Sequence, residues 1–178
     1  SAQNIVKCCN RAGLTIGDII LMPLAAAEAV LSGEERELGV ALVDIGSGTT
    51  DIAVFHDGTV RHSAVLSVGG NHLTNDIAAG LRTPTADAER IKQRYGLAKA
   101  STVSGDQRVE VSSVAGKAAG TVSRQILCEI IEPRMEEIFQ LVQREIAKSG
   151  YEGSLASGVV MTGGSMLLPG AVETAEQV

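Results

Sequence analysis

Aromatic side chains are scarce in this sequence. Phe, Tyr and Trp together make up 2% of the 178 residues, and tryptophan is missing altogether. A platform that stacks the bases of single-stranded nucleic acid needs aromatic side chains, so the composition argues against one. The hydrophobic fraction is nevertheless 44%, which is enough for an aliphatic core.

Positive charge, cysteine and long apolar runs are also in short supply. The formal net charge of −6 argues against a DNA-binding surface, and we expect no nucleic-acid partner. Cys8, Cys9 and Cys128 do not have the spacing of a zinc site, and we interpret them as reduced thiols of a cytoplasmic protein. No apolar run is long enough to span a bilayer.

Apolar runs separated by turn residues predict an α/β chain. Strands are expected at 18–23, at 39–55 as a hairpin, at 60–68 and at 158–162, and 32–37 is expected to be a charged turn. Helices are expected at 2–12, 23–31, 71–81, 84–95 and 121–148, followed by a last helix near the end. Asn71 and Thr83 are the predicted N-caps, and Pro133 should kink or split the longest helix.

The segment DIGSGTTD, residues 44–51, has the chemistry of a phosphate-binding hairpin. Its glycines allow close backbone approach, its amides and hydroxyls can donate to phosphate, and Asp44 could hold Mg²⁺ through water. A Gly-rich turn without a ligand is the alternative interpretation. The candidate cofactor residues of this segment are Asp44, Gly46, Ser47, Gly48, Thr49 and Thr50.

Two further segments could complete a nucleotide site. TGGSMLLPG, residues 162–170, places a Gly turn between a strand and a helix, where Gly163, Gly164 and Ser165 could meet a planar group. In AERIKQ, residues 88–93, Glu89 and Lys92 share one helix face and could bind ribose or base. Taken singly, the first could be an ordinary strand–helix connection and the second a solvent-facing ion pair.

These three segments, in this order, resemble the motifs of the actin, Hsp70 and sugar-kinase superfamily. The resemblance implies an actin-like ATPase (ribonuclease H-like) lobe with a mixed sheet and a small inserted α+β subdomain. It also implies ATP and Mg²⁺ as cofactors, with DIGSGTTD as the second phosphate motif and TGGSMLLPG as the adenosine motif.

A closer resemblance is to the FtsA family of bacterial cell-division proteins. It is carried by PLAAAEAVLSGEERELGVALVDIGSGTTDIAVFHDGTVRH, by GGNHLTNDIAAGLRTPTADAERIKQRYG and by the VEVSSVAG and IIEPRMEEI runs. It implies that 1–38 end domain 1A, that 39–80 and 124–178 form domain 2A, and that 81–123 form domain 2B. The family's first phosphate hairpin and its membrane-anchoring C-terminal helix are expected to lie outside this sequence. Because half of the phosphate site would then be missing, we expect weak or absent nucleotide binding by these residues alone.

The FtsA resemblance implies an ATP-binding adaptor that polymerises and links FtsZ filaments to the cytoplasmic membrane at the septum, together with other divisome proteins. The FtsZ C-terminal peptide is expected to dock on Arg90, Arg94, Arg124 and Arg134. A pilus adaptor of the PilM type and an ATPase of the Hsp70 or sugar-kinase type are the alternatives. Met22 stands where hydrolytic relatives have a glutamate and Glu28 is a poor substitute, so ATP hydrolysis is expected to be slow at most.

Overall fold

The structure is a computed structural model that describes residues 2–104, 106–112 and 120–178. The helices are α1 (Ala2–Arg11), α2 (Met22–Val30), α3 (Gly33–Leu38), α4 (Gly70–Leu81), α5 (Thr85–Tyr95), α6 (Arg124–Lys148) and α7 (Ala171–Ala175). The strands are β1 (Val40–Ile45), β2 (Thr50–His56), β3 (Thr59–Leu66), β4 (Arg108–Val111), β5 (Gly120–Ser123) and β6 (Val159–Thr162). Short 3₁₀ turns are η1 (Ala100–Thr102), η2 (Glu152–Ser154) and η3 (Gly164–Leu167).

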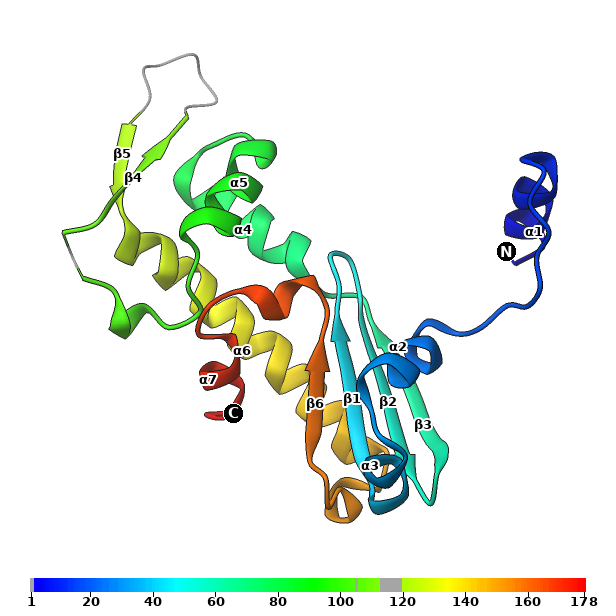
Figure 1. Ribbon diagram of the computed structural model, residues 1–178. Helices are drawn as coiled ribbons and strands as arrows, with labels where there is room; N and C mark the ends of the chain where they lie inside the picture. Colours follow the sequence, from blue (N-terminus) through cyan, green and yellow to red (C-terminus); the bar gives the residue numbers. More distant parts are fainter. Residues whose placement is uncertain (1, 105, 113–119) are drawn as a thin grey trace.

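A mixed four-stranded sheet with the order β3-β2-β1-β6 forms the centre of the molecule (Figure 1). The first three strands are an antiparallel meander, whereas β1 and β6 run parallel. Parallel neighbours require a crossover connection, and here it runs through α4, α5, the β4–β5 hairpin and α6. The predicted α/β fold with a mixed sheet is therefore confirmed.

β1 and β2 are buried on both faces of the sheet. Their successive side chains point to opposite sides and so enter two different cores. Ala41, Val43 and Ile45 join the main core against α6, while Val40 and Leu42 join a smaller core beneath α2. The buried side chains of α6 recur at intervals of three or four residues and so form one apolar face. They include Leu127, Ile131, Met135, Ile138, Val142 and Ile146.

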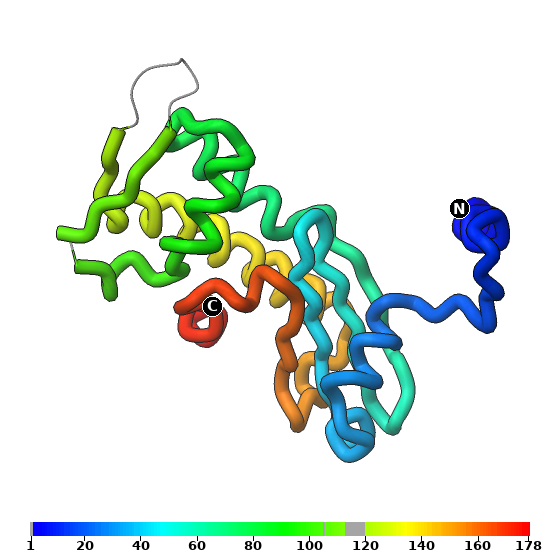
Figure 2. Tube along the Cα trace, turned by 45° about the horizontal axis from the view of Figure 1, so that its top comes forward, coloured from blue at the N-terminus to red at the C-terminus, as the bar shows by residue number. Residues whose placement is uncertain are grey.

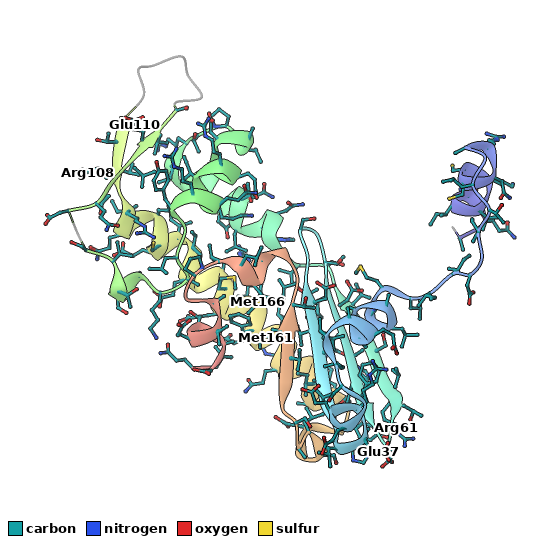
Figure 3. All side chains as sticks on the ribbon, in the orientation of Figure 1. Glu37, Arg61, Arg108, Glu110, Met161 and Met166 are labelled. Carbon is teal, nitrogen blue, oxygen red and sulfur yellow. The ribbon has the colours of Figure 1, made fainter. Side chains whose placement is uncertain are left out.

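The elements inserted between α4 and α6 extend the molecule beyond the sheet (Figure 2). There β4 and β5 form a separate antiparallel pair. Val109 and Val111 face the core, and Arg108 and Glu110 lie on the exposed face of the hairpin (Figure 3). The assignment of 81–123 to a domain of its own, like the other predicted domain boundaries, stays a prediction.

Three predictions about the first 40 residues meet different outcomes. A helix is present at α1, but the predicted strand at 18–23 is wrong, because residues 14–21 form no regular element. Ile20 and Leu21 are 63% and 68% exposed there, and no described strand pairs with them. The predicted turn at 32–37 is also wrong: Ser32 and Glu35 form a capping box, which starts α3.

The helix starts after the meander also differ from the predictions. α4 begins at Gly70, so Asn71 lies in its first turn and is not its cap. α5 begins at Thr85 with Pro84 as its N-cap, whereas Thr83 is buried. α6 starts at Arg124 and is not split at Pro133.

Candidate nucleotide-binding site

The three predicted nucleotide segments meet around one cavity of about 470 Å³. The cavity is lined from the β1–β2 turn, from the turn after β6 and from α5, and also by residues of α4 and α6. Predicted residues on its wall are Gly46, Ser47, Glu89, Lys92, Gly164 and Ser165. Asp44, Gly48, Thr49, Thr50 and Gly163 do not line the cavity itself.

Sheet register explains why two Gly turns face each other here. Asp44 is paired with Thr162 in the parallel ladder of β1 and β6, so both turns leave the carboxyl ends of neighbouring strands. Ligands of α/β sheets bind outside these carboxyl ends. Gly163 has φ +97° and approaches β1 so closely that an added Cβ would lie 2.5 Å from the Ile45 carbonyl oxygen. Only glycine therefore fits between the two turns.

The β1–β2 turn is attached to the first turn of α4. The amide of Gly70 donates to the Gly46 carbonyl at 2.9 Å, and the amide of Asn71 donates to the Ser47 carbonyl at 2.7 Å. A Cβ on Gly69 would lie 2.6 Å from the Gly46 carbonyl oxygen. These contacts turn the hairpin's carbonyls toward α4 and hold it at the edge of the cavity.

The hydroxyl groups of the hairpin have different surroundings. Thr50 is fully buried and donates to the Val68 carbonyl at 2.8 Å, so in this structure its hydroxyl braces the sheet. Thr49 donates to the Asp51 carboxylate at 3.2 Å. Ser47 is exposed at the cavity. Of the three predicted donors, Ser47 is thus the one on the cavity wall.

Asp44 of β1 is the register partner of Asp51 on the antiparallel strand β2. Burial raises the pKa of the Asp44 carboxyl, and the neighbouring Asp51 charge raises it further. The described residues contain no group of three or more His, Cys, Asp or Glu side chains that could hold a metal ion. Mg²⁺ keeps most of its water and commonly uses one or two carboxylates with substrate phosphates, so a single carboxylate is chemically compatible with it. The water-mediated role of Asp44 stays a prediction.

On the opposite wall, Glu89 and Lys92 form an ion pair at 2.7 Å. Lys92 also donates to the Gly70 carbonyl at 3.0 Å and to the Thr74 hydroxyl at 2.9 Å. Burial acts to raise the pKa of the Glu89 carboxyl, but hydrogen bonds from Lys92, Thr74 and Gln93 outweigh it and hold that pKa below its usual range. Glu89 is therefore a carboxylate at neutral pH.

Several residues of the cavity were not among the predicted site residues. They are Gly70, Asn71, Leu73, Gln93, Met135, Leu167, Leu168 and Pro169. The last three lie inside the predicted segment 162–170, and Gln93 lies inside 88–93, but none of the four was named as a candidate side chain. Leu73 on α4 and Met135 on α6 carry no local signal, because only packing brings them to the site.

The four predicted partner arginines have different surroundings. Arg90 and Arg94 line a second hollow of about 280 Å³ with Glu110 of β4. Arg124 donates to the Tyr95 carbonyl and the Gln107 side chain. Arg134 holds Asp76 through two N–H groups at 2.6 and 3.1 Å, which ties α6 to α4.

Across the described ranges, which omit 1, 105 and 113–119, every helix falls short of the length and apolarity that a membrane crossing demands.

Comparison with known proteins identifies the family. A family model described as "Cell division protein FtsA" matches residues 41–178. FtsA of Pseudomonas aeruginosa is 51% identical over 178 residues, which are 100% of this chain and 43% of that protein. FtsA of Escherichia coli K12 is 45% identical over 99% of this chain and 44% of its own length. The chain thus spans less than half the length of these curated relatives.

Solved structures show the same fold at low sequence identity. MreB5 of Spiroplasma citri bound to ADP has a TM-score of 0.78 and 20% identity, covering 94% of this chain and 54% of that one. The PilM–PilN type IV pilus biogenesis complex has a TM-score of 0.73 and 18% identity, covering 99% and 44%. The fold is that of the actin-like ATPases, as predicted. The family model and the curated relatives show that the chain belongs to the FtsA family of cell-division proteins.

Proposed function

We propose that this chain is the nucleotide-binding part of an actin-like adaptor that binds ATP with Mg²⁺, polymerises, and links FtsZ filaments to the cytoplasmic side of the membrane at the septum. The observation that carries the nucleotide proposal is the single cavity at which all three segments meet. Its volume of about 470 Å³ lies within the range of about 300–1,000 Å³ typical of small-molecule sites. Among the structural neighbours, MreB5 of S. citri is described bound to ADP and to AMPPNP.

The positions of polar and apolar groups support one orientation of the nucleotide, with its phosphates at the β1–β2 turn and its base on the apolar wall. We place the phosphate end at the β1–β2 turn, where Ser47 lines the cavity and Asp44, at the end of β1 but off the cavity wall, would hold Mg²⁺ through water. Leu168, Pro169 and Met135 provide an apolar wall for the base, and Glu89 offers a carboxylate to ribose hydroxyls. In this proposal the nucleotide sets a conformation for assembly.

Slow hydrolysis fits the surroundings of α2. Met22 carries no group that could polarise water, and Glu28 is engaged by Arg36 at 2.5 Å. The carboxylate that precedes the proline in hydrolytic relatives therefore has no evident substitute on this helix. We propose that ATP turnover is not the main output of the site.

Nucleotide binding can be tested in a chimera in which the chain replaces the matching segment of P. aeruginosa FtsA. We expect the chimera to bind Mg-ATP in calorimetry and the 178-residue chain alone to bind weakly or not at all. Gly164→Phe should abolish binding, because this open glycine lines the cavity. Gly153→Phe, at an open glycine of η2 away from the cavity, should not. An unmodified chimera that folds but does not bind ATP would contradict the proposal.

The proposed FtsZ contact lies at the hollow between α5 and β4. Arg90 pairs with Asp87 at 2.6 Å but is 69% exposed, and the guanidinium carbon of the exposed Arg94 lies 5.3 Å from the Tyr95 ring centroid, so both cations can meet an acidic peptide. Arg134 pairs with Asp76 and is only 28% exposed, so it is the weakest member of the predicted set. Charge reversal at Arg90 and Arg94 should weaken binding of an FtsZ C-terminal peptide, whereas Lys148→Glu should not. Equal peptide affinities for the unsubstituted protein, the variant reversed at Arg90 and Arg94, and Lys148→Glu would exclude this surface.

The pilus-adaptor alternative rests on fold alone, at 18% identity to the PilM–PilN complex. Membership of the FtsA family favours the cell-division role. Self-association, contacts with other divisome proteins and membrane attachment through a further helix remain part of the proposal for the whole protein.

A further inference from the structure

The ammonium group of Lys92 has no donor left for a ligand. A lysine has three N–H donors and no acceptor. In this structure they meet the Glu89 carboxylate at 2.7 Å, the Thr74 hydroxyl at 2.9 Å and the Gly70 carbonyl at 3.0 Å. Lys92 is also only 15% exposed. Contact with a nucleotide would require it to give up one of these three bonds.

Thr74 of α4 connects the same groups from the interior. It is 3% exposed, and its hydroxyl contacts the Glu89 carboxylate and the Gly70 carbonyl while it accepts from Lys92. Removing a buried hydroxyl here would leave both charged partners without one hydrogen bond. Thr74 does not line the cavity and carries no local sequence signal.

Gly70 connects this cluster to the phosphate hairpin. Its carbonyl accepts from Lys92, and its amide donates to the Gly46 carbonyl at 2.9 Å. The Ser165 hydroxyl donates to the same Gly46 carbonyl at 3.1 Å. One connected set of hydrogen bonds thus joins α5, α4, the β1–β2 turn and the turn after β6.

We propose that Lys92 and Thr74 are positioning residues that hold the phosphate hairpin through Gly70, and that Glu89 and Gln93 are the groups of α5 that meet the ligand. The proposal rests on the nucleotide function proposed above. Glu89 keeps a second carboxylate oxygen outside the cluster, where it accepts from Gln93 at 2.8 Å. Both Glu89 and Gln93 line the cavity.

A first test uses the ligand-free 178-residue chain and needs no nucleotide. Thr74→Val and Lys92→Met should speed hydrogen exchange at the Gly70 amide about two- to tenfold relative to β1 amides, which report global opening. Thr74→Ser keeps the hydroxyl and should restore the exchange rate. Lys148→Met removes an exposed lysine elsewhere and should leave it unchanged. Unaltered exchange at Gly70 in both Thr74→Val and Lys92→Met would overturn the proposal.

A second test compares ligands in the chimera. Thr74→Val and Lys92→Met should weaken ATP binding about two- to tenfold and leave adenosine binding unchanged, because adenosine does not use the hairpin. The effect of Lys92→Met should be equal for ATP and for 2′-deoxy-ATP or 3′-deoxy-ATP. If it vanishes with either deoxy analogue, Lys92 is a ribose ligand and the proposal is wrong. A chimera that binds no nucleotide would refute the proposed function, while the exchange test would still decide the hydrogen-bond link.

Discussion

At the residue scale, close backbone approach determines which glycines the candidate site needs. Gly163 combines a positive φ with contacts to β1, and Gly69 faces the Gly46 carbonyl. Gly164, the next residue, has an ordinary φ and open space around it. Neighbouring glycines of one motif therefore serve different purposes.

Replacing Gly163 by alanine should lower the free energy of unfolding by about 1–3 kcal/mol from backbone strain alone. The added Cβ would also collide with Asp44 Oδ1 and the Ile45 carbonyl. Urea denaturation of Gly163→Ala beside Gly164→Ala measures the difference, and the second variant should be nearly neutral. Equal stability of the two variants would show that the tight approach of these turns is not required.

At the element scale, polar contacts between distant segments hold helices against the sheet. Glu145 of α6 accepts from His62 of β3 at 3.3 Å and from Lys148 at 2.9 Å. The hydrogen bond from Lys148 holds the pKa of the Glu145 carboxyl below its usual range against the opposing effect of burial, and the bond from His62 adds to the lowering. An acid whose pKa is lowered on folding adds stability at higher pH and loses it on acidification.

Glu145→Gln should therefore lower the urea midpoint at pH 7. The gap to the unsubstituted protein should narrow as the pH falls below about 4.3, the ordinary pKa of glutamate, because both proteins are then neutral at this position. Glu152→Gln, at an exposed glutamate of η2, is the matched control. A gap that does not change with pH would mean that the carboxylate charge contributes nothing.

At the scale of the whole molecule, two cores share one sheet. The main core lies between the sheet and α6, and the smaller one consists of Ala27, Leu31, Val40, Leu42, Ala53 and Phe55. α1 contributes no buried residue and stands apart from the rest in both Figure 1 and Figure 2. Met161 of β6 and Met166 of η3 pack against the main core on either side of the Gly turn that follows β6 (Figure 3).

Deleting residues 1–13 should leave the thermal midpoint of the chain unchanged, because α1 buries nothing. Deleting residues 1–31 removes Ala27 and Leu31 from the smaller core and should cost about 2–5 kcal/mol. Differential scanning calorimetry of the two truncated chains makes the comparison. A marked loss of stability in the shorter deletion would show that α1 packs on the molecule in solution.

The sequence by itself determined the meander, the order of the three nucleotide segments and the two Gly turns. These features depend on local chemistry: apolar runs of strand length, glycines that allow close backbone approach, with a positive φ at Gly163, and a register that follows from both. The sequence also contains the capping-box pattern of Ser32 and Glu35, which predicts a helix start, although the charged composition of 32–37 is typical of a turn.

Only the tertiary structure decided which side chains work together. The Thr50 hydroxyl is bonded inside the sheet, and Arg134 is paired with Asp76. All three donors of Lys92 have acceptors, and Leu73 and Met135 lie at the cavity. Each of these outcomes depends on groups that are close in space and distant in the chain. The partners of a side chain are set by the packing of α4, α5 and α6 on the sheet, and no local pattern records that packing.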